Sequence, residues 1–355
     1  MERRKVLQSA VAALILPWYG FRTWASTEAA GLSQPERDSE ISIILPQKSN
    51  TLPTDESLDS YQYRLYRAVL SVIHNHYSGK PMPIWGKAPE EVDLETRIKN
   101  ITYWVLRSVQ KHSATYFIDP AWIMAQIMEE SFFYEFAVSW SFASGICQFT
   151  MPTAEKFGMV TPRTSRISEE RLKHPERAQA LDRLKALRKR KNKVRSKNKE
   201  LFSNQSKLFK ESLRHHIRGT TLTRAESWLN ALQEMDSIEE SMQSNRKKYM
   251  NFLRSNYEGK DIFDHNDLDF LQQLDERVVY KKPIEAMLKI MTRYMRGRNG
   301  NILVATAGYN SGLSRTYYPY AVYEPYGKIP NYEETVSYVS KIVVNHYEIL
   351  QRLTE

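Results

Sequence analysis

Apolar residues recur at helical spacing along much of this 355-residue chain, and this periodicity constrains the fold more than any other feature. It is clear in three segments of the first half: Tyr61–Tyr77, Asp93–His112 and Pro120–Ser131. The third segment follows Asp119, so that an N-cap residue precedes a proline at the first helical position. Strand patterns are nearly absent, apart from the short run Ile41–Leu45. The sequence therefore predicts an all-α fold.

A seven-residue repeat marks the middle of the chain. Its two stripes consist of Leu187, Val194, Leu201 and Leu208, and of Trp228, Met235, Met242 and Tyr249. Two heptad stripes joined by a glycine-containing turn predict an antiparallel helical hairpin with a coiled-coil seam. At 1.5 Å per residue, we expect a first arm from Glu176 to His215 to be about 60 Å long.

The net charge of +10 is concentrated in the same part of the chain. Residues 163–218 hold 19 lysines and arginines against six acidic residues, which gives +13 and leaves −3 for the rest. A charge confined to one arm is typical of a solvated helical face. It also fits an anionic envelope surface, or a protein of an envelope-spanning secretion or conjugation system. We do not expect nucleic acid to be the main partner.

The first 25 residues are typical of a secretory signal peptide. Arg3, Arg4 and Lys5 precede an apolar run, Val6–Phe21, that is shorter than the ~20 residues of a membrane-spanning helix. The segment 23–25 offers a small-x-small cleavage site. The arginine pair also fits a twin-arginine signal, so both export routes remain open. We expect an exported protein of the periplasm or cell envelope.

The most informative stretch extends from Glu130 to Ala154. It contains Glu-Ser-Phe-Phe, then Ala-Val-Ser ending at Ser139, Gly-Ile-Cys-Gln ending at Gln148, and finally Met-Pro and Thr-Ala. This pattern resembles the catalytic segment of the soluble lytic transglycosylase family, which has a lysozyme-like fold. Two further blocks of that family follow in order, at 307–312 and at 334–339.

The chain departs from the family pattern in three ways. Phe142 replaces a usual glycine, Pro152 lies one position late, and residues 163–274 interrupt the order of the blocks. The expected organisation is a signal peptide (1–25), a linker (26–58), an N-terminal helical extension (59–93), a discontinuous lytic transglycosylase domain (94–162 and 275–355) and an inserted basic helical hairpin (163–274). We expect the hairpin to be dispensable for turnover of soluble glycan.

The resemblance implies an enzyme that cleaves the MurNAc-GlcNAc β-1,4 bond of peptidoglycan and forms 1,6-anhydro-MurNAc. Glu130 is then the single catalytic residue, first as acid and then as base. Burial beside Phe132 and Phe133 would raise the pKa of this carboxyl and keep it protonated. Helical periodicity does not distinguish Glu130 from Glu129, but the motif spacing favours Glu130. No second carboxylate of the lysozyme type occupies a matching position.

The resemblance also implies six substrate-binding residues: Ser139, Gln148, Tyr309, Asn310, Glu334 and Tyr338. In the family, the tyrosine that matches Tyr309 reaches the catalytic glutamate with its hydroxyl. Other roles remain open, since Ser139 and Gln148 could stabilise a loop and Asn310 could cap a turn. Glu334 and Tyr338 could brace their helix instead of contacting sugar.

Metal and cofactor sites are not indicated by the sequence. Cys147 is the single cysteine, which excludes an internal disulfide, and His215 and His216 lack other ligands nearby. We therefore expect no cofactor and no metal. Two alternatives to a lyase remain: a hydrolytic muramidase, and a non-enzymatic protein that binds or organises the cell wall.

Overall fold

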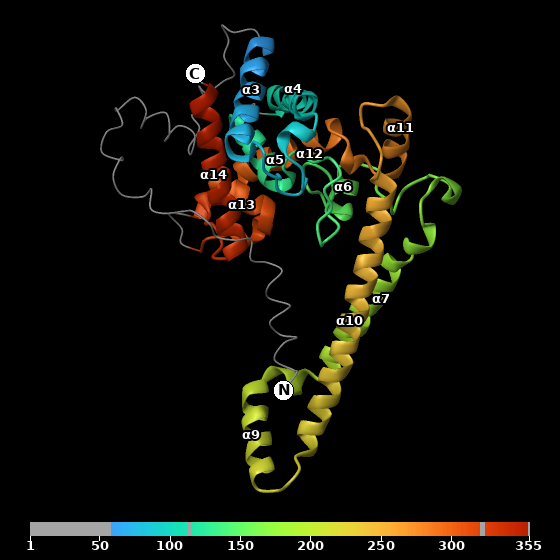
Figure 1. Cartoon of the computed structure of the whole chain (residues 1–355). Helices are drawn as coiled ribbons and strands as arrows, with labels where there is room; N and C mark the ends of the chain where they lie inside the picture. The colour runs from blue at the N-terminus through green and yellow to red at the C-terminus, as the bar shows by residue number, and fades with distance from the viewer. Residues whose placement is uncertain (1–57, 113–115, 320–323, 354–355) are drawn as a thin grey trace.

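The computed structural model describes residues 58–112, 116–319 and 324–353 (Figure 1). Helices are the regular elements of these ranges, and the described residues contain no strand, only two isolated bridges in the loop after α5. The predicted all-α fold is confirmed. The predicted signal peptide, and the linker up to residue 57, lie outside the described residues. No helix in the described ranges is long and apolar enough to cross a membrane.

A helical domain is built around α5 (Pro120–Ser131), whose residues 120–128 are all buried. Five helices form the domain with it: α3 (Leu58–Tyr77), α4 (Leu94–His112), α12 (Lys281–Gly297), α13 (Ile302–Ser311) and α14 (Glu333–Leu353). α14 packs against both α5 and α3, while α12 packs against α4 and α13. The segments on either side of the long insertion therefore form one core.

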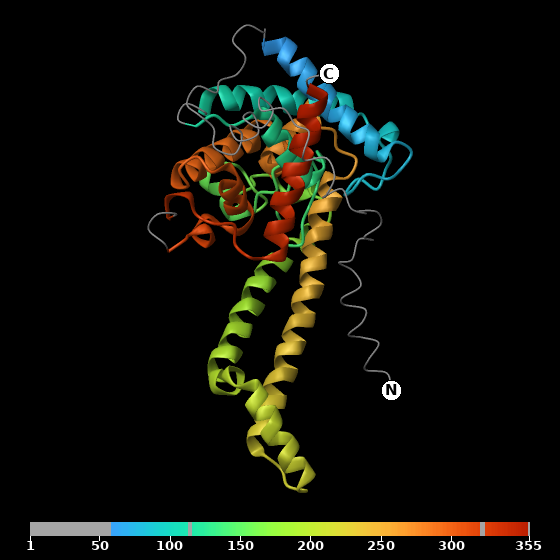
Figure 2. The same ribbon diagram turned by 90° about the vertical axis from the view of Figure 1, so that its left-hand side faces the viewer.

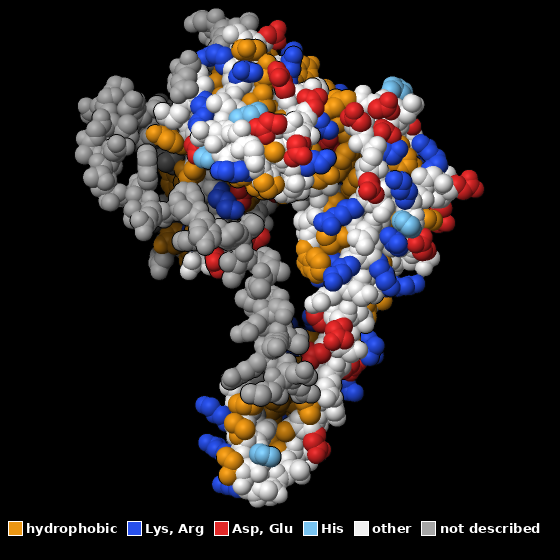
Figure 3. Space-filling model, viewed as in Figure 1, with side chains coloured by type: hydrophobic (Ala, Val, Ile, Leu, Met, Phe, Trp, Pro, Cys, Tyr) orange, Lys and Arg blue, Asp and Glu red, His pale blue; other side chains and the backbone are white. Residues whose placement is uncertain are grey.

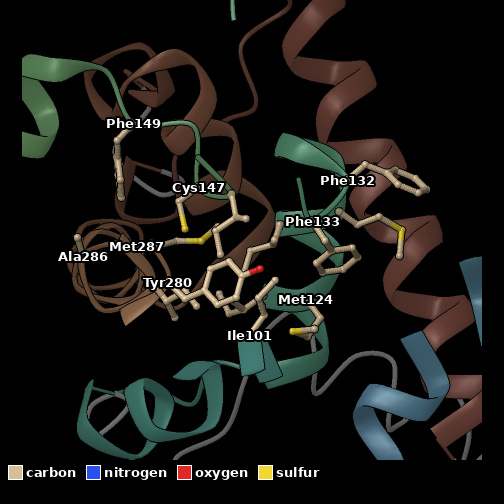
Figure 4. Close-up of a cluster of buried hydrophobic side chains, with 14 of the residues drawn as sticks. Ile101, Met124, Phe132, Phe133, Cys147, Phe149, Tyr280, Ala286 and Met287 are labelled. Carbon is tan, nitrogen blue, oxygen red and sulfur yellow. The ribbon is translucent and has the colours of Figure 1, made fainter. Parts of the chain in front are cut away.

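The apolar spacing of each outer helix explains this packing. In α4, Ile98, Ile101 and Val105 recur every three or four residues and are fully buried, because they form the face turned to the core. Figure 4 shows Ile101, Met124 of α5 and Met287 of α12 as members of one cluster of buried side chains.

The first helix of the described residues also belongs to this core. α3 buries Leu65, Val69 and Ile73 and packs against α4 and α14. The expected boundary at residue 93 therefore does not separate two cores. The division of the chain into domains otherwise remains a prediction.

Residues 180–257 form a long projection from the helical domain (Figures 1 and 2). The outgoing arm comprises α7 (Ala180–Lys197), α8 (Lys199–Ser203) and α9 (Gln205–Ile217), and the returning arm is the 35-residue α10 (Thr223–Tyr257). α7 lies along α10. An ion pair of 2.8 Å between Arg190 and Glu234, and another between Lys191 and Glu239, join the two arms.

The outgoing arm differs from the continuous helix expected between Glu176 and His215. It is interrupted at Asn198 and again at Asn204, where the backbone leaves the helical region. The Asn198 side chain donates to the carbonyl of Val194 at 2.9 Å. Asparagine side chains compete in this way for backbone groups and so disfavour helix interiors. The arm consequently changes direction before its tip.

Short elements connect the hairpin to the domain: α6 (Met151–Lys156), η2 (Glu169–Arg171) and η3 (Pro175–Arg177) precede it, and α11 (His265–Leu274) and η4 (Glu276–Val278) follow it. Three further 3₁₀ helices lie within the helical domain: η1 (Pro89–Glu91), η5 (Leu313–Thr316) and η6 (Glu324–Tyr326). At the root, Asn256 of α10 exchanges two hydrogen bonds with the backbone of Lys173, at 2.8 and 2.9 Å. The root of the hairpin is thereby tied to the chain that enters it.

Candidate functional site

Glu130 lies in the last turn of α5, and local sequence fixes both ends of that helix. Asp119 caps its start by accepting a hydrogen bond from the backbone N–H of Ala121 at 2.9 Å. Phe132 ends it by adopting a left-handed conformation with φ of 51°. The carboxyl of Glu130 is therefore presented, half-buried, at the end of an otherwise buried helix.

The two adjacent glutamates at this helix end have different partners. Glu129 forms an ion pair of 2.9 Å with Lys341 of α14, whereas Glu130 accepts a hydrogen bond of 2.5 Å from the hydroxyl of Tyr338. Burial raises the pKa of both carboxyls, and the ammonium of Lys341 opposes this at Glu129. At Glu130 burial dominates and raises the pKa to about 8. Glu130 is thus protonated at neutral pH and can donate a proton.

Tyr338 links Glu130 to the core of the domain. Its hydroxyl accepts a hydrogen bond of 3.1 Å from the amide of Gln126 and donates to Glu130. The side chains of Tyr338 and Gln126 are buried, so they hold the carboxyl of Glu130 in a fixed orientation. The bond from Tyr338 favours the ionised carboxyl and lowers its pKa, but by less than burial raises it.

Tyr309 does not make the contact that the resemblance implies. Its hydroxyl donates to the backbone carbonyl of Cys147 at 2.8 Å. Tyr338 reaches Glu130 instead, because α14 packs along α5, whereas Tyr309 of α13 points to the loop that follows α5. The hydroxyl that contacts the candidate acid therefore comes from a different block of the sequence.

Asn310 and Glu334 both lie at the surface of the helical domain. The side-chain oxygen of Asn310 accepts a hydrogen bond of 2.8 Å from the hydroxyl of Thr335, which joins the end of α13 to the first turn of α14. Glu334 is exposed in that first turn. Both positions are accessible to a ligand, and their part in binding remains a prediction.

Ser139 and Gln148 lie in the loop between α5 and α6, where their side chains contact the backbone. Ser139 accepts a hydrogen bond of 3.0 Å from the N–H of Ala143. The amide of Gln148 donates to the carbonyls of Gly145 and Ala137, at 2.9 and 3.3 Å. Both side chains stabilise the loop in this structure and are half-buried, so part of each remains open to solvent.

A buried arginine stabilises the same loop through hydrogen bonds to its backbone. Arg277 forms a fully buried ion pair of 2.6 Å with Asp275 and donates to the carbonyls of Phe142 and Phe149, at 2.7 and 3.0 Å. A Cβ at Gly145 would lie 1.7 Å from the carbonyl oxygen of Arg277. The glycine, at φ of 83°, is thus required both by its conformation and by this close approach.

The root of the hairpin also packs on the loop. Phe142 adopts a φ of 65°, which explains why the family usually has glycine at this position. Its buried ring meets the Tyr249 ring of α10 edge-on, with centroids 4.9 Å apart. Arg246 of α10 lies 5.0 Å from the ring centroid of the exposed Trp140. Deleting the whole hairpin would remove these contacts, so the structure favours a loss of turnover, contrary to the expectation from the sequence.

A groove of about 790 Å³ separates the segment after α5 from the end of α10. Tyr134 and Phe136 line one side, and Arg254 and Tyr257 line the other. The hairpin root therefore forms one wall of a groove that begins four residues after Glu130.

Cys147 faces the core. It is fully buried, and Figure 4 shows its side chain beside Met287. Burial raises the pKa of its thiol, which disfavours the reactive thiolate. Within the described residues, no group of three or more His, Cys, Asp and Glu side chains is arranged to hold a metal ion.

Three residues of this site were missed in the sequence: Gln126, Lys341 and Arg277. Gln126 precedes Glu130 by four residues, so it lies on the same helix face, and this spacing could have identified it. Lys341 follows Tyr338 by three residues, but its pairing with Glu129 depends on how α14 packs. Nothing in the local sequence pattern around Arg277 marks it as buried.

Comparison with known proteins supports the fold and the general class of function. The family model of the transglycosylase SLT domain matches residues 107–200, about a quarter of the chain, and this confirms the resemblance to soluble lytic transglycosylases. The match includes Glu130, Ser139 and Gln148, and it ends before the later blocks. No curated protein and no solved structure gave a match. An SLT domain indicates a peptidoglycan-cleaving function of the lytic transglycosylase type.

Proposed function

We propose that this chain, through its SLT domain, is an exported lytic transglycosylase of the cell envelope that cleaves the MurNAc-GlcNAc β-1,4 bond and forms 1,6-anhydro-MurNAc. The observation that carries the proposal is the Glu130 carboxyl. Its pKa of about 8 and its hydrogen bond to Tyr338 fit a group that must donate a proton at neutral pH and then bear a negative charge.

One glutamate suffices for this reaction. Glu130 donates its proton to the glycosidic oxygen as the bond from that oxygen to C1 of MurNAc breaks. The resulting carboxylate then removes the proton from the 6-hydroxyl of the same sugar, and that oxygen forms the new bond to C1. Glu130 ends protonated, as it began, and no water is added to either product.

Tyr338 has a defined part in this cycle. Its hydroxyl donates to Glu130, so it stabilises the carboxylate that exists between the two proton transfers. Gln126 donates in turn to Tyr338 and orients its hydroxyl. We assign both as positioning residues for the acid.

The remaining predicted residues would bind the glycan. Ser139 and Gln148 shape the loop after Glu130, while Asn310 and Glu334 lie exposed near the end of α13 and the start of α14. We propose that a glycan strand lies between these two elements, which the sequence separates but the fold brings to the same end of α5.

A hydrolytic muramidase is less well supported. Retaining hydrolases need a second carboxylate about 5 Å from the acid. In the described residues, Glu129 is the carboxyl whose charge raises the pKa of Glu130, and it is already paired with Lys341. A non-enzymatic, wall-binding protein would have no use for a protonated, partly accessible carboxyl.

The two adjacent glutamates offer a matched test. Glu130→Gln should reduce the lysis of purified sacculi by about 10²–10⁴-fold, the usual contribution of general acid catalysis. Glu129→Gln changes the neighbouring residue in the same way and should retain most activity. A lytic Glu130→Gln variant, or an inactive Glu129→Gln variant that is still folded, would contradict the proposal.

A further inference from the structure

The distal end of the hairpin carries exposed apolar side chains that nothing in the described structure covers. Phe209, Leu213 and Ile217 of α9 are spaced four residues apart and therefore line one face of the helix. They are 53, 45 and 82% exposed. Leu208 is buried instead, and α9 packs against α10. The hairpin thus uses another face of α9 for its own packing, and Phe209, Leu213 and Ile217 form a free "α9 stripe".

Basic side chains border the α9 stripe. Lys210, Arg214 and Arg218 each follow one residue of the stripe, so they lie along its edge, and all three are exposed. None of them forms an ion pair with another described residue. Figure 3 shows apolar and basic side chains side by side at this end of the molecule. The charge at the tip is therefore available to an external partner.

We propose that the α9 stripe and its basic edge dock the tip of the hairpin onto a phospholipid surface with anionic head groups. An exposed apolar stripe with a basic edge is typical of helices that lie in the membrane interface. The apolar side chains would enter the boundary of the acyl region, and the cations would meet the head groups. A soluble anionic polymer could bind the cations but would leave the stripe in water, and a neutral partner surface would not use the charge.

The position of the stripe gives the docking a geometric consequence. α10 contains 35 residues and, at 1.5 Å per residue, spans about 50 Å between the tip and the helical domain. A hairpin docked at its tip would hold the helical domain about that far from the bilayer. The proposal rests on the hairpin alone and does not depend on enzymatic activity.

Vesicle cosedimentation of the full chain tests the proposal. We expect binding to vesicles that contain phosphatidylglycerol, weaker binding to pure phosphatidylcholine, and loss of binding as salt rises. The variant F209S/L213S/I217S should bind at least about tenfold more weakly. The charge-reversal variant K210E/R214E/R218E leaves the stripe intact and should lose the preference for anionic vesicles.

Matched controls make each outcome decisive. The variant Y63S/V343S/V344S removes three exposed apolar side chains from the helical domain and should bind vesicles as the wild type does. Circular dichroism should show that all variants retain their helices, and their turnover of soluble glycan should be unchanged. Equal vesicle binding by the wild type and the stripe variant would overturn the proposal. So would a stripe that mediates only self-association or protein capture.

Discussion

Glu130 and Glu129 are identical side chains in adjacent positions, yet their surroundings give them different chemistry. Glu130 lies against the buried hydroxyl of Tyr338, while Glu129 pairs with Lys341. The first can therefore act as an acid near neutral pH, and the second serves to attach α14 to α5.

The raised pKa of Glu130 predicts a pH dependence. A general acid works in its protonated form, so activity should fall as pH rises through about 8. The initial rate of glycan cleavage, measured between pH 5 and pH 10 with folding monitored in parallel, checks this. If activity instead fell near the ordinary pKa of a carboxyl, the general acid would be another group, or a Glu130 whose pKa is not raised.

Two tyrosines provide a matched pair of substitutions. Tyr338→Phe removes the hydrogen bond that lowers the pKa of Glu130, so the alkaline limb should move to higher pH and the rate should drop. Tyr309→Phe removes a bond to the carbonyl of Cys147 and should leave the limb in place. A shift in the pH profile of the Tyr309 variant instead of the Tyr338 variant would reverse this assignment.

At the scale of elements, the loop after α5 depends on close backbone approach. Gly145→Ala would bring a Cβ to 1.7 Å from the carbonyl oxygen of Arg277, in addition to the cost of a left-handed alanine. We expect the free energy of unfolding to fall by about 3 kcal/mol or more, and we expect the activity to be lost as well. Gly158→Ala is the control, since φ is also positive there but no atom lies within 4 Å of the added Cβ. For this variant we expect the free energy of unfolding to fall by only about 1 kcal/mol. Urea denaturation compares the two, and equal losses would argue against the close contact.

The helices could be predicted from sequence because their signals are local. The apolar spacing of α4 and the cap at Asp119 require no knowledge of the rest of the chain. The contact between Glu130 and Tyr338 joins residues 208 positions apart, so motif spacing could suggest both residues but not which tyrosine touches the acid. The buried ion pair of Arg277 with Asp275 could not be predicted from the sequence either. Charged residues are seldom buried, and composition gives no sign of those that are.

The heptad stripes predicted one feature of the hairpin and missed another. They indicated two paired arms, and α7 does lie along α10. They did not indicate the interruptions at Asn198 and Asn204, because a polar side chain in a helical pattern is usually tolerated as a solvent-facing residue. Asparagine matters here through its bond to the backbone of Val194, a detail of geometry.

For the whole molecule, the hairpin has two parts with separate roles. Its root contacts the loop through Arg246, Tyr249 and Tyr257, whereas α9 at its tip packs against α8 and α10. The positive charge of residues 163–218 therefore lies mainly on the projection, where the proposed docking would use it.

Two deletions distinguish these parts. Replacing residues 192–238 with a short glycine-serine turn, where Lys191 and Glu239 pair across the arms, keeps the root. This variant should turn over soluble glycan as the full chain does but lose vesicle binding. Removing 176–257 takes away the partners of Phe142 and Phe136 and should lower both Tm and turnover. Equal turnover by both variants would show that the root does not support the site.

In the proposed reaction, Glu130 directs the 6-hydroxyl, and not water, to C1 of the broken bond. Mass spectrometry of sacculi digested in water labelled with a heavy oxygen isotope tests it most directly, with Glu130→Gln as the blank. We predict muropeptides with anhydro ends, lighter by one water than reducing ends and free of the label. Reducing ends that carry the label would rule out attack by the 6-hydroxyl and identify the enzyme as a hydrolase.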